Sequence, residues 1–505
     1  SIKNHDVRND LDKYFYRTAV NQQYAFNVSG NTPYVNYYMS AGYDDNMPSL
    51  TGERYNRISL LSQNSFKPAK NLQVTLGVNY VQTNNRSGNN QGYNFYSAVA
   101  DKQYYPYAAL ADANGNALPV YEDYFKNWVD TAGDAKLFNW VEKPLADVNE
   151  VVNKSQTIDY LINTGISYNI LPALSISAKY QYEHQLIVNS SLYKQDAYYT
   201  RNLLNNYSSI DPYSGAVTYN IPAGGILDMN NGALTSHQGR AQLNYNHGWS
   251  NNKHQLTAIA GFEINSTINS TATNRLYGYD EDHNTINAYV NYNVRYLQFS
   301  YPGFRYIPNN ATITSNTDHF MSYYANAAYT YKSVYTLSAS ARTDEANLFG
   351  VRTNQKGTPL WSAGASWYVS KENFYKFNWL PLFKLRITYG FNGNISRQAT
   401  AYTTIEYNTG ALTPLPIAFV TNPANPNLKW ERTGTLNIGA DFSLKNDIVS
   451  GTVEYYQKHA RDLLGPAPLD PTLGIGDFTN PSYYGNVAGM NGNGIDVQLN
   501  TKNIN

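Results

Sequence analysis

The sequence contains no cysteine, and only 15% of its residues are charged. Without cysteine there is neither a disulfide framework nor a thiolate metal site, although this absence leaves the compartment open. An ordinary globular protein has roughly 25% charged residues. Lys plus Arg and Asp plus Glu both number 37, so the formal net charge is zero. The composition therefore lacks the basic footprint of a nucleic-acid-binding protein.

The sequence also lacks any long apolar run. A transmembrane helix needs about 20 predominantly apolar residues, whereas no stretch here approaches that length and the mean hydropathy is -0.52. A helical membrane protein is therefore excluded. A transmembrane β-barrel is not, because only every second residue of its strands faces lipid. The chain begins at Ser1 with neither an initiator Met nor a signal peptide, which is typical of a mature or trimmed fragment.

What the sequence does have is regular two-residue alternation of apolar and polar side chains. In residues 435–444 (TLNIGADFSL) every second residue is apolar, and after a tight turn at 445–447 the pattern continues in 449–456 (VSGTVEYY). Both segments are predicted strands with one apolar and one polar face. At about ten residues each, they are longer than the five or six that are typical of soluble strands.

About fifteen such runs follow one another, from 71–80 (NLQVTLGVNY) through 241–245 and 256–264 to 494–500 (GIDVQLN). The connections between them are sorted by length. Short turns are expected near residues 30–33, 64–70, 171–173, 246–253, 332–333, 373–382 and 445–447, and long segments near 83–153, 185–237, 265–318, 392–431 and 460–491. Such sorting is typical of outer-membrane barrels, which have short periplasmic turns and long extracellular loops.

Aromatic residues gather near the ends of the predicted strands. They are Tyr80, Trp249, Tyr331, Tyr335, Trp361, Trp367, Trp430, Tyr455 and Tyr456. One interpretation is that they form interfacial girdles, because amphipathic rings settle at the level of the lipid headgroups. The alternative is that Tyr and Trp are simply good strand formers. Together with strand length and loop sorting, the girdle is the better interpretation.

The number of runs conflicts with a closed barrel, because bacterial single-chain barrels have an even number of strands. An open sheet edge in hydrocarbon leaves several backbone N–H and C=O groups unpaired, at several kcal/mol each. We therefore expect an all-β fold, an antiparallel transmembrane β-barrel to which this chain contributes about 15 strands of a larger whole.

Several stretches, in order, resemble the SusC/RagA-like family of TonB-dependent outer-membrane transporters. They are residues 14–30 (YFYRTAVNQQYAFNVSG), 361–374 (WSAGASWYVSKENF), 380–394 (LPLFKLRITYGFNGN), 425–433 (NPNLKWERT) and 485–499 (GNVAGMNGNGIDVQL). Residues 341–350 (ARTDEANLFG) depart from the family pattern at 345–347, where a glycine-serine-serine run is usual. That departure affects one loop.

The resemblance implies a 22-stranded barrel filled by an N-terminal plug. Residues 1–505 would then be a partial barrel domain, beginning at the junction with the plug and lacking both the plug and the C-terminal strands. The implied partners are a SusD-like surface lipoprotein, TonB acting through the absent plug segment, membrane lipid and lipopolysaccharide, and a second transporter–lid pair in a dimer. The implied location is the outer membrane of a Gram-negative bacterium, and no nucleic acid is expected.

No catalytic constellation is evident, so an enzyme is not expected. The histidines show no HExxH spacing, and His247 and His254 face each other across a predicted turn, where a metal site is less expected than two polar turn residues. The stretch YDEDH at 279–283 makes Asp280 and Asp282, with Glu281 between them, a weak candidate for a structural calcium site. A solvated loop tip explains the same residues, and no other cofactor is expected.

The first long segment is rich in aromatic residues. Its candidate ligand-binding residues are Tyr104, Tyr105, Tyr107, Tyr121, Tyr124 and Trp128, with Phe125 beside them. Flat amphipathic rings stack on a sugar ring or a peptide at little entropic cost. The alternative, that these rings pack the loop on itself, has slightly more weight, because a loop of about seventy residues must pack to be ordered.

Two functions therefore remain under consideration. The first is an active transporter that imports oligosaccharides or peptides with TonB-derived energy, with Leu174, Ile176, Ile438, Phe442, Val449 and Val453 facing lipid. The second is a soluble β-rich surface adhesin or lectin with the same bias toward Asn, Tyr and Thr. Loop sorting and the ordered motifs favour the transporter, and a need for detergent would distinguish the two.

Overall fold

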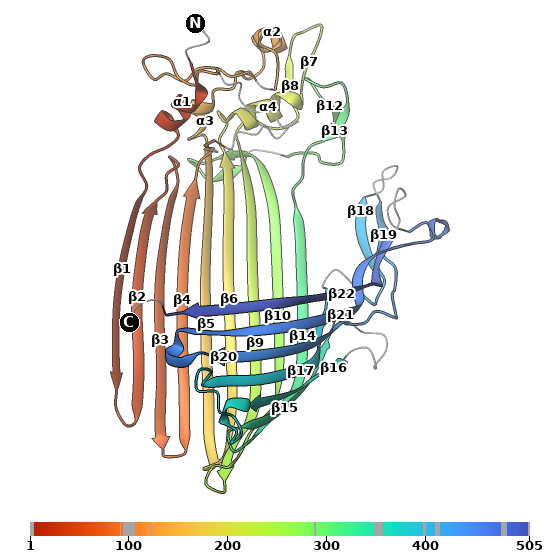
Figure 1. Cartoon of the computed structure of the whole chain (residues 1–505). Coiled ribbons are helices and arrows are strands. Elements are labelled where there is room, and N and C mark those ends of the chain that lie inside the picture. The colour runs from red at the N-terminus through yellow and green to blue at the C-terminus, as the bar shows by residue number, and fades with distance from the viewer. Residues whose placement is uncertain are drawn as a thin grey trace.

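One very large antiparallel sheet dominates the computed structural model (Figure 1). The structure describes residues 5–90, 92–93, 107–121, 123–286, 289–347, 357–396, 400–409, 415–475 and 482–502. Within these ranges the sheet has 16 strands. Its main strands are β1 (Val20–Asn31), β2 (Val35–Met47), β3 (Arg54–Ala69), β4 (Leu72–Ser87), β5 (Val151–Leu171), β6 (Leu174–Tyr193), β9 (Gly225–Trp249), β10 (His254–Asp280), β14 (Thr312–Tyr331), β15 (Tyr335–Ala346), β16 (Gly357–Tyr368), β17 (Leu382–Asn394), β20 (Glu431–Ser443), β21 (Val449–Pro468) and β22 (Ser482–Thr501).

These strands are neighbours in the sheet in the same order as in the sequence, and only β11 (Thr285–Ile286), paired with the end of β10, lies off the path. Each strand is antiparallel to the next, as in the continuous register of β9 with β10 and of β10 with β14. The expectation of about fifteen successive antiparallel strands is confirmed for the described residues.

Smaller elements interrupt the long connections. The helices are α1 (Val7–Tyr14), α2 (Lys126–Thr131), α3 (Pro144–Asp147) and α4 (Tyr198–Asn206), with short 3₁₀ turns η2 (Ala132–Ala135), η3 (Val369–Lys371), η4 (Lys445–Asp447) and η5 (Pro471–Leu473). Three two-stranded ribbons pair β7 (Ser208–Ile210) with β8 (Val217–Tyr219), β12 (Arg295–Leu297) with β13 (Phe304–Tyr306), and β18 (Thr404–Thr409) with β19 (Pro416–Asn422). No helix in the described ranges is both long enough and apolar enough to cross a membrane.

The sheet curls around on itself. In Figure 1 the strands from β1 to β14 run up and down the view, and the strands from β15 to β22 cross in front of them at a steep angle. Barrel strands tilt by roughly 35–45° to the axis, so the strands of opposite walls cross in this way. The small helices and the ribbons β7–β8 and β12–β13 lie together at the end opposite the short turns, and we call them the loop layer.

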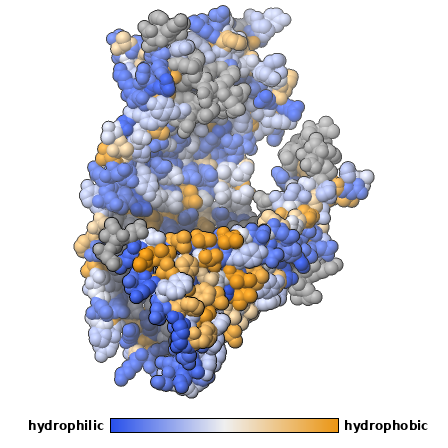
Figure 2. All heavy atoms as spheres, viewed as in Figure 1, coloured by the Kyte–Doolittle hydropathy of each residue, from blue (hydrophilic) through white to orange (hydrophobic). Residues whose placement is uncertain are grey.

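The two faces of the sheet differ as the alternation predicts. Cross-strand rows on one face are apolar, for example Ile387, Ile438, Tyr455 and Ile495 on four successive strands. The neighbouring rows on the other face are polar or charged, with Arg386 beside Gly439 and Glu454 beside Asp496. Figure 2 shows the apolar face as an orange area over the crossing strands, on the outside of the curl.

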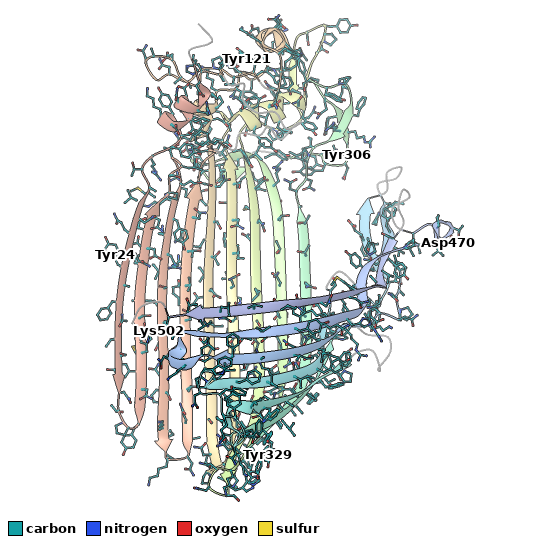
Figure 3. The ribbon with its side chains drawn as sticks, in the orientation of Figure 1. Tyr24, Tyr121, Tyr306, Tyr329, Asp470 and Lys502 are labelled. Carbon is teal, nitrogen blue, oxygen red and sulfur yellow. The ribbon has the colours of Figure 1, made fainter. Side chains whose placement is uncertain are left out.

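The six residues that we expect to face lipid all lie on this outer face. Ile176 is 42% exposed, Ile438 45% and Val453 40%, while Leu174, Phe442 and Val449 are half-buried by their neighbours. Tyr24 on β1, labelled in Figure 3, is likewise 61% exposed on the apolar face.

The seven short turns lie at one end of the strands, and most are tighter than predicted. The turn between β3 and β4 consists of residues 70–71, so the prediction of a turn at 64–70 is wrong, because strand pairing continues through Phe66. Lys332 and Ser333, between β14 and β15, both adopt left-handed backbone conformations, with φ of 52° and 55°. Two successive left-handed residues match the twist of the flanking strands, so the hairpin closes within three residues.

Strand length is the clearest departure from the sequence-based expectation. β9 has 25 residues and β10 has 27, whereas the alternation predicts strands only over 241–245 and 256–264. The remaining parts of both strands are mostly polar on both faces, so their side chains show no period of two. Backbone pairing continues there without an apolar face.

The aromatic girdle is present at the short-turn end. Trp249, Tyr331 and Trp367 lie in the last residues of their strands and Tyr335 is the first residue of β15. Tyr329, labelled in Figure 3, lies 6.2 Å from Trp249 between ring centroids. Trp430 is an exception: it is only 6% exposed and packs with Leu428 and Ala401 in a small core among the loops. The prediction of a girdle position is therefore wrong for Trp430, which is covered by loop segments. It is also wrong for Tyr456, which lies on the polar face of β21, opposite Asn437.

The two faces of β20 should respond differently to charge. We expect Ile438→Lys to reduce the free energy of unfolding in lipid vesicles by about 2–4 kcal/mol, because it places an ammonium group in hydrocarbon. Asn437→Lys is the matched control, because Asn437 lies on the polar face, where its amide donates to Glu454 Oε2 at 3.1 Å. Denaturant titration of both variants measures the difference, and equal losses would contradict the assignment of the faces.

Candidate functional site

The loop layer has its own apolar cores, which hold the long connections in place. One core joins α1 to the segment between β4 and β5, through Leu11, Phe15, Leu110 and Val120. A second joins α4 and the ends of β9 and β10 to the segment before β14, and it includes Leu204, Ile226, Tyr277 and Ile307. These side chains are at most 4% exposed. The layer is therefore a packed unit.

Aromatic rings from distant segments meet in this layer. The Tyr124 ring stacks on that of Trp128 with centroids 4.4 Å apart, and the Trp140 ring meets both edge-on, at 5.3 Å and 4.9 Å. Phe299 lies 6.0 Å from Trp140. We call Tyr124, Trp128, Trp140 and Phe299 the aromatic cluster.

Hydrogen bonds fix the aromatic cluster to two other long connections. The Tyr124 hydroxyl lies 3.0 Å from Asn202 Oδ1 on α4 and 3.1 Å from Ser300 Oγ. The Asn206 amide also donates to Asn202 Oδ1, at 2.8 Å. Three loops that are far apart in the sequence are thus joined at one tyrosine, which leaves the ring of Tyr124 little freedom.

A buried carboxylate supports the same region. Asp147, at the end of α3, accepts from the backbone N–H of Tyr198 at 2.7 Å and from the Asn89 amide at 2.6 Å. Tyr198 is the first residue of α4, so Asp147 caps that helix from another loop. Burial raises the pKa of Asp147 above its usual range, against the lowering effect of these two donors.

The predicted ligand-binding residues do not all meet. Tyr104 and Tyr105 lie outside the described residues. Tyr124 and Trp128 are brought together, Tyr121 is half-buried beside Lys126, whose Nζ is 5.8 Å from the ring centroid, and Tyr107 is 53% exposed elsewhere in the layer. Phe125 is 87% exposed. Trp140 and Phe299 were missed, and the only signal for Trp140 is a lone tryptophan within a polar segment.

The concave face of the sheet forms the second part of the site. A hollow of about 800 Å³ lies against seven strands, β2 to β6, β9 and β10. Its inward-pointing side chains are mostly amides and hydroxyls, including Asn36, Gln63, Ser65, Thr75, Asn163, Gln181, Gln238 and Asn265. Such a surface offers many neutral donors and acceptors, and the charges among them are few.

The charged residues that line the hollow are Lys179, Arg240 and Glu263, and the last two belong to a charged network on the same face. Glu263 on β10 pairs with Arg240 on β9 and, at 3.1 Å, with Arg342 on β15. Arg342 also pairs with Asp344 at 2.6 Å. The Tyr324 ring lies 5.9 Å and 5.8 Å from the two guanidinium carbons.

Gly261 makes room for this arrangement, because a Cβ there would lie 2.7 Å from the Tyr324 hydroxyl and 2.5 Å from the Ala241 carbonyl oxygen. Any other residue at this position would displace the tyrosine from between the two arginines.

The acidic side chain at the end of β10 forms its hydrogen bonds within the tip that follows the strand. Asp280 accepts from His283 Nδ1 at 2.7 Å and from the backbone N–H of Asp282 at 2.9 Å, and Asp282 itself is exposed. This contact lowers the pKa of Asp280 and raises that of His283. In the part of the chain that the structure describes, no three His, Cys, Asp or Glu side chains are grouped so that they could hold a metal ion.

The two histidines near the β9–β10 turn are separated by a tryptophan. Trp249 stacks on His254 with centroids 5.3 Å apart and lies 5.9 Å from His247. His254 Nδ1 is 2.6 Å from the Tyr329 hydroxyl. The two imidazoles are thus members of the aromatic girdle.

The comparison with known families agrees with this architecture. A family model described as "TonB dependent receptor-like, beta-barrel" matches residues 127–502. The chain belongs to this family. The resemblance noted from the sequence motifs is thereby confirmed at the level of the TonB-dependent receptor β-barrel.

Curated relatives carry the same family name. The chain is 26% identical over 499 residues to TonB-dependent receptor P39 of Formosa agariphila, which covers 98% of this chain and 42% of the relative. It is 22% identical over 543 residues to TonB-dependent receptor SusC of Bacteroides thetaiotaomicron, covering 98% of this chain and 46% of SusC. The chain therefore spans less than half of the length of these two relatives.

Among solved structures, the RagAB peptide transporter has the same fold. The superposition has a TM-score of 0.73 and covers 99% of this chain and 50% of the solved chain, at 20% identity. At that identity the likeness concerns the fold alone.

The aromatic cluster should stabilise the loop layer of this TonB-dependent receptor barrel. Trp140 is 4% exposed, so we expect Trp140→Ala to destabilise the layer by about 3–5 kcal/mol. Phe125→Ala is the control, because its side chain is almost fully exposed and its loss should cost less than about 0.5 kcal/mol. Hydrogen exchange of residues 123–140 and of α4 reports local opening. Equal exchange in the two variants would contradict a structural role for the cluster.

Asp147 should make the loop layer more stable as the pH falls. Its folded pKa is raised, so its contribution to stability is complete below the unfolded pKa of about 3.9 and is lost as the pH rises through the folded pKa. We expect exchange in α4, corrected for intrinsic rates, to slow between about pH 7 and about pH 4. Asp147→Asn should lose this dependence, and its persistence in that variant would assign the effect to other groups.

Proposed function

We propose that this chain forms the wall of an active transporter in the outer membrane of a Gram-negative bacterium. The cargo class is oligosaccharides or peptides, and the energy comes through TonB. The observation that carries the proposal is the pair of unlike faces of one curled sheet, apolar outside and polar inside, in a chain of the TonB-dependent receptor β-barrel family. A soluble adhesin would expose that whole apolar face to water, which soluble proteins avoid.

Cargo is captured at the loop layer in this proposal. Tyr107, Tyr121, Tyr124 and Trp128 are the candidate contacts, and Phe125 adds an exposed ring beside them. Rings held rigid by Trp140 and by the Tyr124 hydrogen bonds bind a flat apolar surface without losing much entropy. Packing between Tyr124 and Trp128 therefore also fixes the position of the exposed ring of Phe125 in this proposal.

The cargo then passes along the concave face. The amides and hydroxyls that line the 800 Å³ hollow exchange hydrogen bonds with a neutral polar cargo and hold it weakly at any one place. No bond in the cargo is made or broken, so the proposal requires neither a catalytic group nor a cofactor. Glu263, Arg342 and Asp344 on this face are engaged with each other, so in this proposal the neutral groups, together with Lys179, contact the cargo.

A SusD-like surface lipoprotein is the proposed partner at the loop layer, and two such transporter–lid pairs form the proposed dimer. Both elements rest on membership of the family and on likeness to SusC and RagAB. The layer offers exposed rings at this end of the barrel, among them Phe125 at 87% and Tyr213 at 97% exposure.

Uptake by whole cells tests the proposal. Cells that carry the gene should accumulate labelled oligosaccharides or labelled peptides from one of the two classes, and deletion of the gene or of TonB should abolish that accumulation. A proton uncoupler should have the same effect as loss of TonB, because the energy comes from the proton gradient in this proposal. Phe125→Ala should weaken capture without loss of the folded barrel. Accumulation that persists without TonB would refute active transport, and a protein that stays in solution without detergent would refute the membrane placement.

A further inference from the structure

The seven short turns contain more positively than negatively charged residues. They comprise residues 32–34, 70–71, 172–173, 250–253, 332–334, 369–381 and 444–448. These turns contain six lysines, no arginine and two acidic residues. The turns therefore have four more positive than negative charges, although the formal net charge of the whole chain is zero. We propose that this end of the barrel is a binding surface for anionic phospholipid headgroups.

The six lysines form no ion pair with a carboxylate in the described residues, although the pKa of the Glu372 carboxyl is lowered by its hydrogen bonds and also by nearby Lys332. These lysines are Lys70, Lys253, Lys332, Lys371, Lys376 and Lys445, and none of the ion pairs of the described chain includes them. Lys371 Nζ donates to the Ser333 carbonyl oxygen at 3.0 Å and lies 4.3 Å from the centroid of the Tyr368 ring. Such contacts orient the ammonium groups and do not neutralise them.

The two acidic residues are engaged by other donors. Glu372 accepts from Trp367 Nε1 at 3.1 Å and from the Tyr335 hydroxyl. Asp447 accepts from the Ser443 hydroxyl at 2.5 Å. These hydrogen bonds fix the two carboxylates but do not neutralise them, so the excess of four positive charges at this end is unchanged.

The turn between β16 and β17 exposes more aromatic rings than any other of the seven turns. It has 13 residues, 369–381, and exposes Phe374 (64%), Phe377 (57%) and Trp379 (59%). Ile448, in the neighbouring turn, is 55% exposed. We call residues 369–381 the aromatic turn.

The rings of the aromatic turn continue the aromatic girdle of the sheet. Ring centroids are 6.4 Å apart between Tyr335 and Trp367, and 6.2 Å between Trp367 and Phe374. The Phe377 and Trp379 rings follow, 6.3 Å from each other. The backbone N–H of Lys445 donates to the Trp379 carbonyl oxygen at 2.9 Å, which joins the aromatic turn to the next one.

This combination fits one occupant. Indole and phenyl rings settle at the boundary between acyl chains and headgroups, and each lysine near an anionic lipid surface strengthens attachment by about fivefold. The proposal commits to anionic phospholipid rather than to a soluble anion, because the exposed rings beside the lysines need an apolar phase. It rests on the membrane placement made under the proposed function.

Fluorescence quenching by brominated lipids tests the inference. The protein is reconstituted in bilayers that contain brominated phosphatidylglycerol or brominated phosphatidylcholine, and the signal of Trp379 is obtained by subtracting that of Trp379→Phe. We expect half-maximal quenching of Trp379 at about a fivefold lower mole fraction of phosphatidylglycerol than of phosphatidylcholine. High salt should reduce this difference, because it screens exposed charges.

Lysine variants test whether the lysine charges, rather than the aromatic rings, cause the preference for phosphatidylglycerol. In Lys371→Gln/Lys376→Gln/Lys445→Gln the two lipids should quench equally, whereas Lys13→Gln/Lys143→Gln/Lys194→Gln, at the opposite end, should keep the preference. Equal quenching in the unchanged protein would overturn the proposal, as would a preference that survives loss of the three lysines. Quenching of the other tryptophans without that of Trp379 would place the turn outside the bilayer. If neither lipid quenches any tryptophan, the membrane placement itself fails.

Discussion

Hydrogen bonding between neighbouring backbones is the constraint on which the rest of this structure depends. Main strands such as β6, β9 and β10 pair with their neighbours over long continuous stretches, so the N–H and C=O groups there are satisfied whatever side chains the strands carry. The side chains are then free to differ between the faces. A polar interior next to an apolar exterior would be unstable in a soluble globule, but it is the arrangement that a bilayer requires.

Because the wall needs no apolar core, most of the buried side chains lie elsewhere. The three apolar cores of the described chain all lie among the long connections and the strand ends beside them. A second kind of contact joins these loops to the wall: Arg275 on β10 pairs with Asp228 on β9 and reaches Tyr199 on α4 at 2.9 Å. The loop layer is therefore stabilised by apolar cores, as an ordinary small domain is, whereas the sheet does not depend on such a core.

The sequence predicted those parts of the structure that depend on local alternation. The hairpin of β20 and β21, the order of the strands and the sorting of the turns all follow from a period of two and from residues that favour turns. The outer parts of β9 and β10 could not be predicted in this way, because side chains such as His237, Thr235 and Asn231 show no apolar face.

The aromatic cluster depends on contacts that the sequence cannot show. Trp140 and Phe299 come from different long connections, and nothing near either residue indicates the other. The same is true of Glu372 and Tyr335, whose hydroxyl reaches it from β15. By contrast, Tyr124 and Trp128 are four residues apart, the first just before α2 and the second within it, so their stacking depends on local chain geometry. Sequence reasoning thus identified the two rings of the aromatic cluster that local chain geometry brings together.

The length of the β9–β10 hairpin has one more consequence. A strand of 27 residues is about 90 Å long, whereas the hydrocarbon core of a bilayer is about 30 Å thick. On its outer face β10 is mostly apolar as far as Ile268, with Ser266 as an exception, and its next outward residues are Ser270, Ala272 and Asn274. In the proposed membrane, a stiff ribbon thus stands clear of the headgroups and carries the loop layer with it. A molecule arriving from outside would encounter the protein before it encountered the lipid surface.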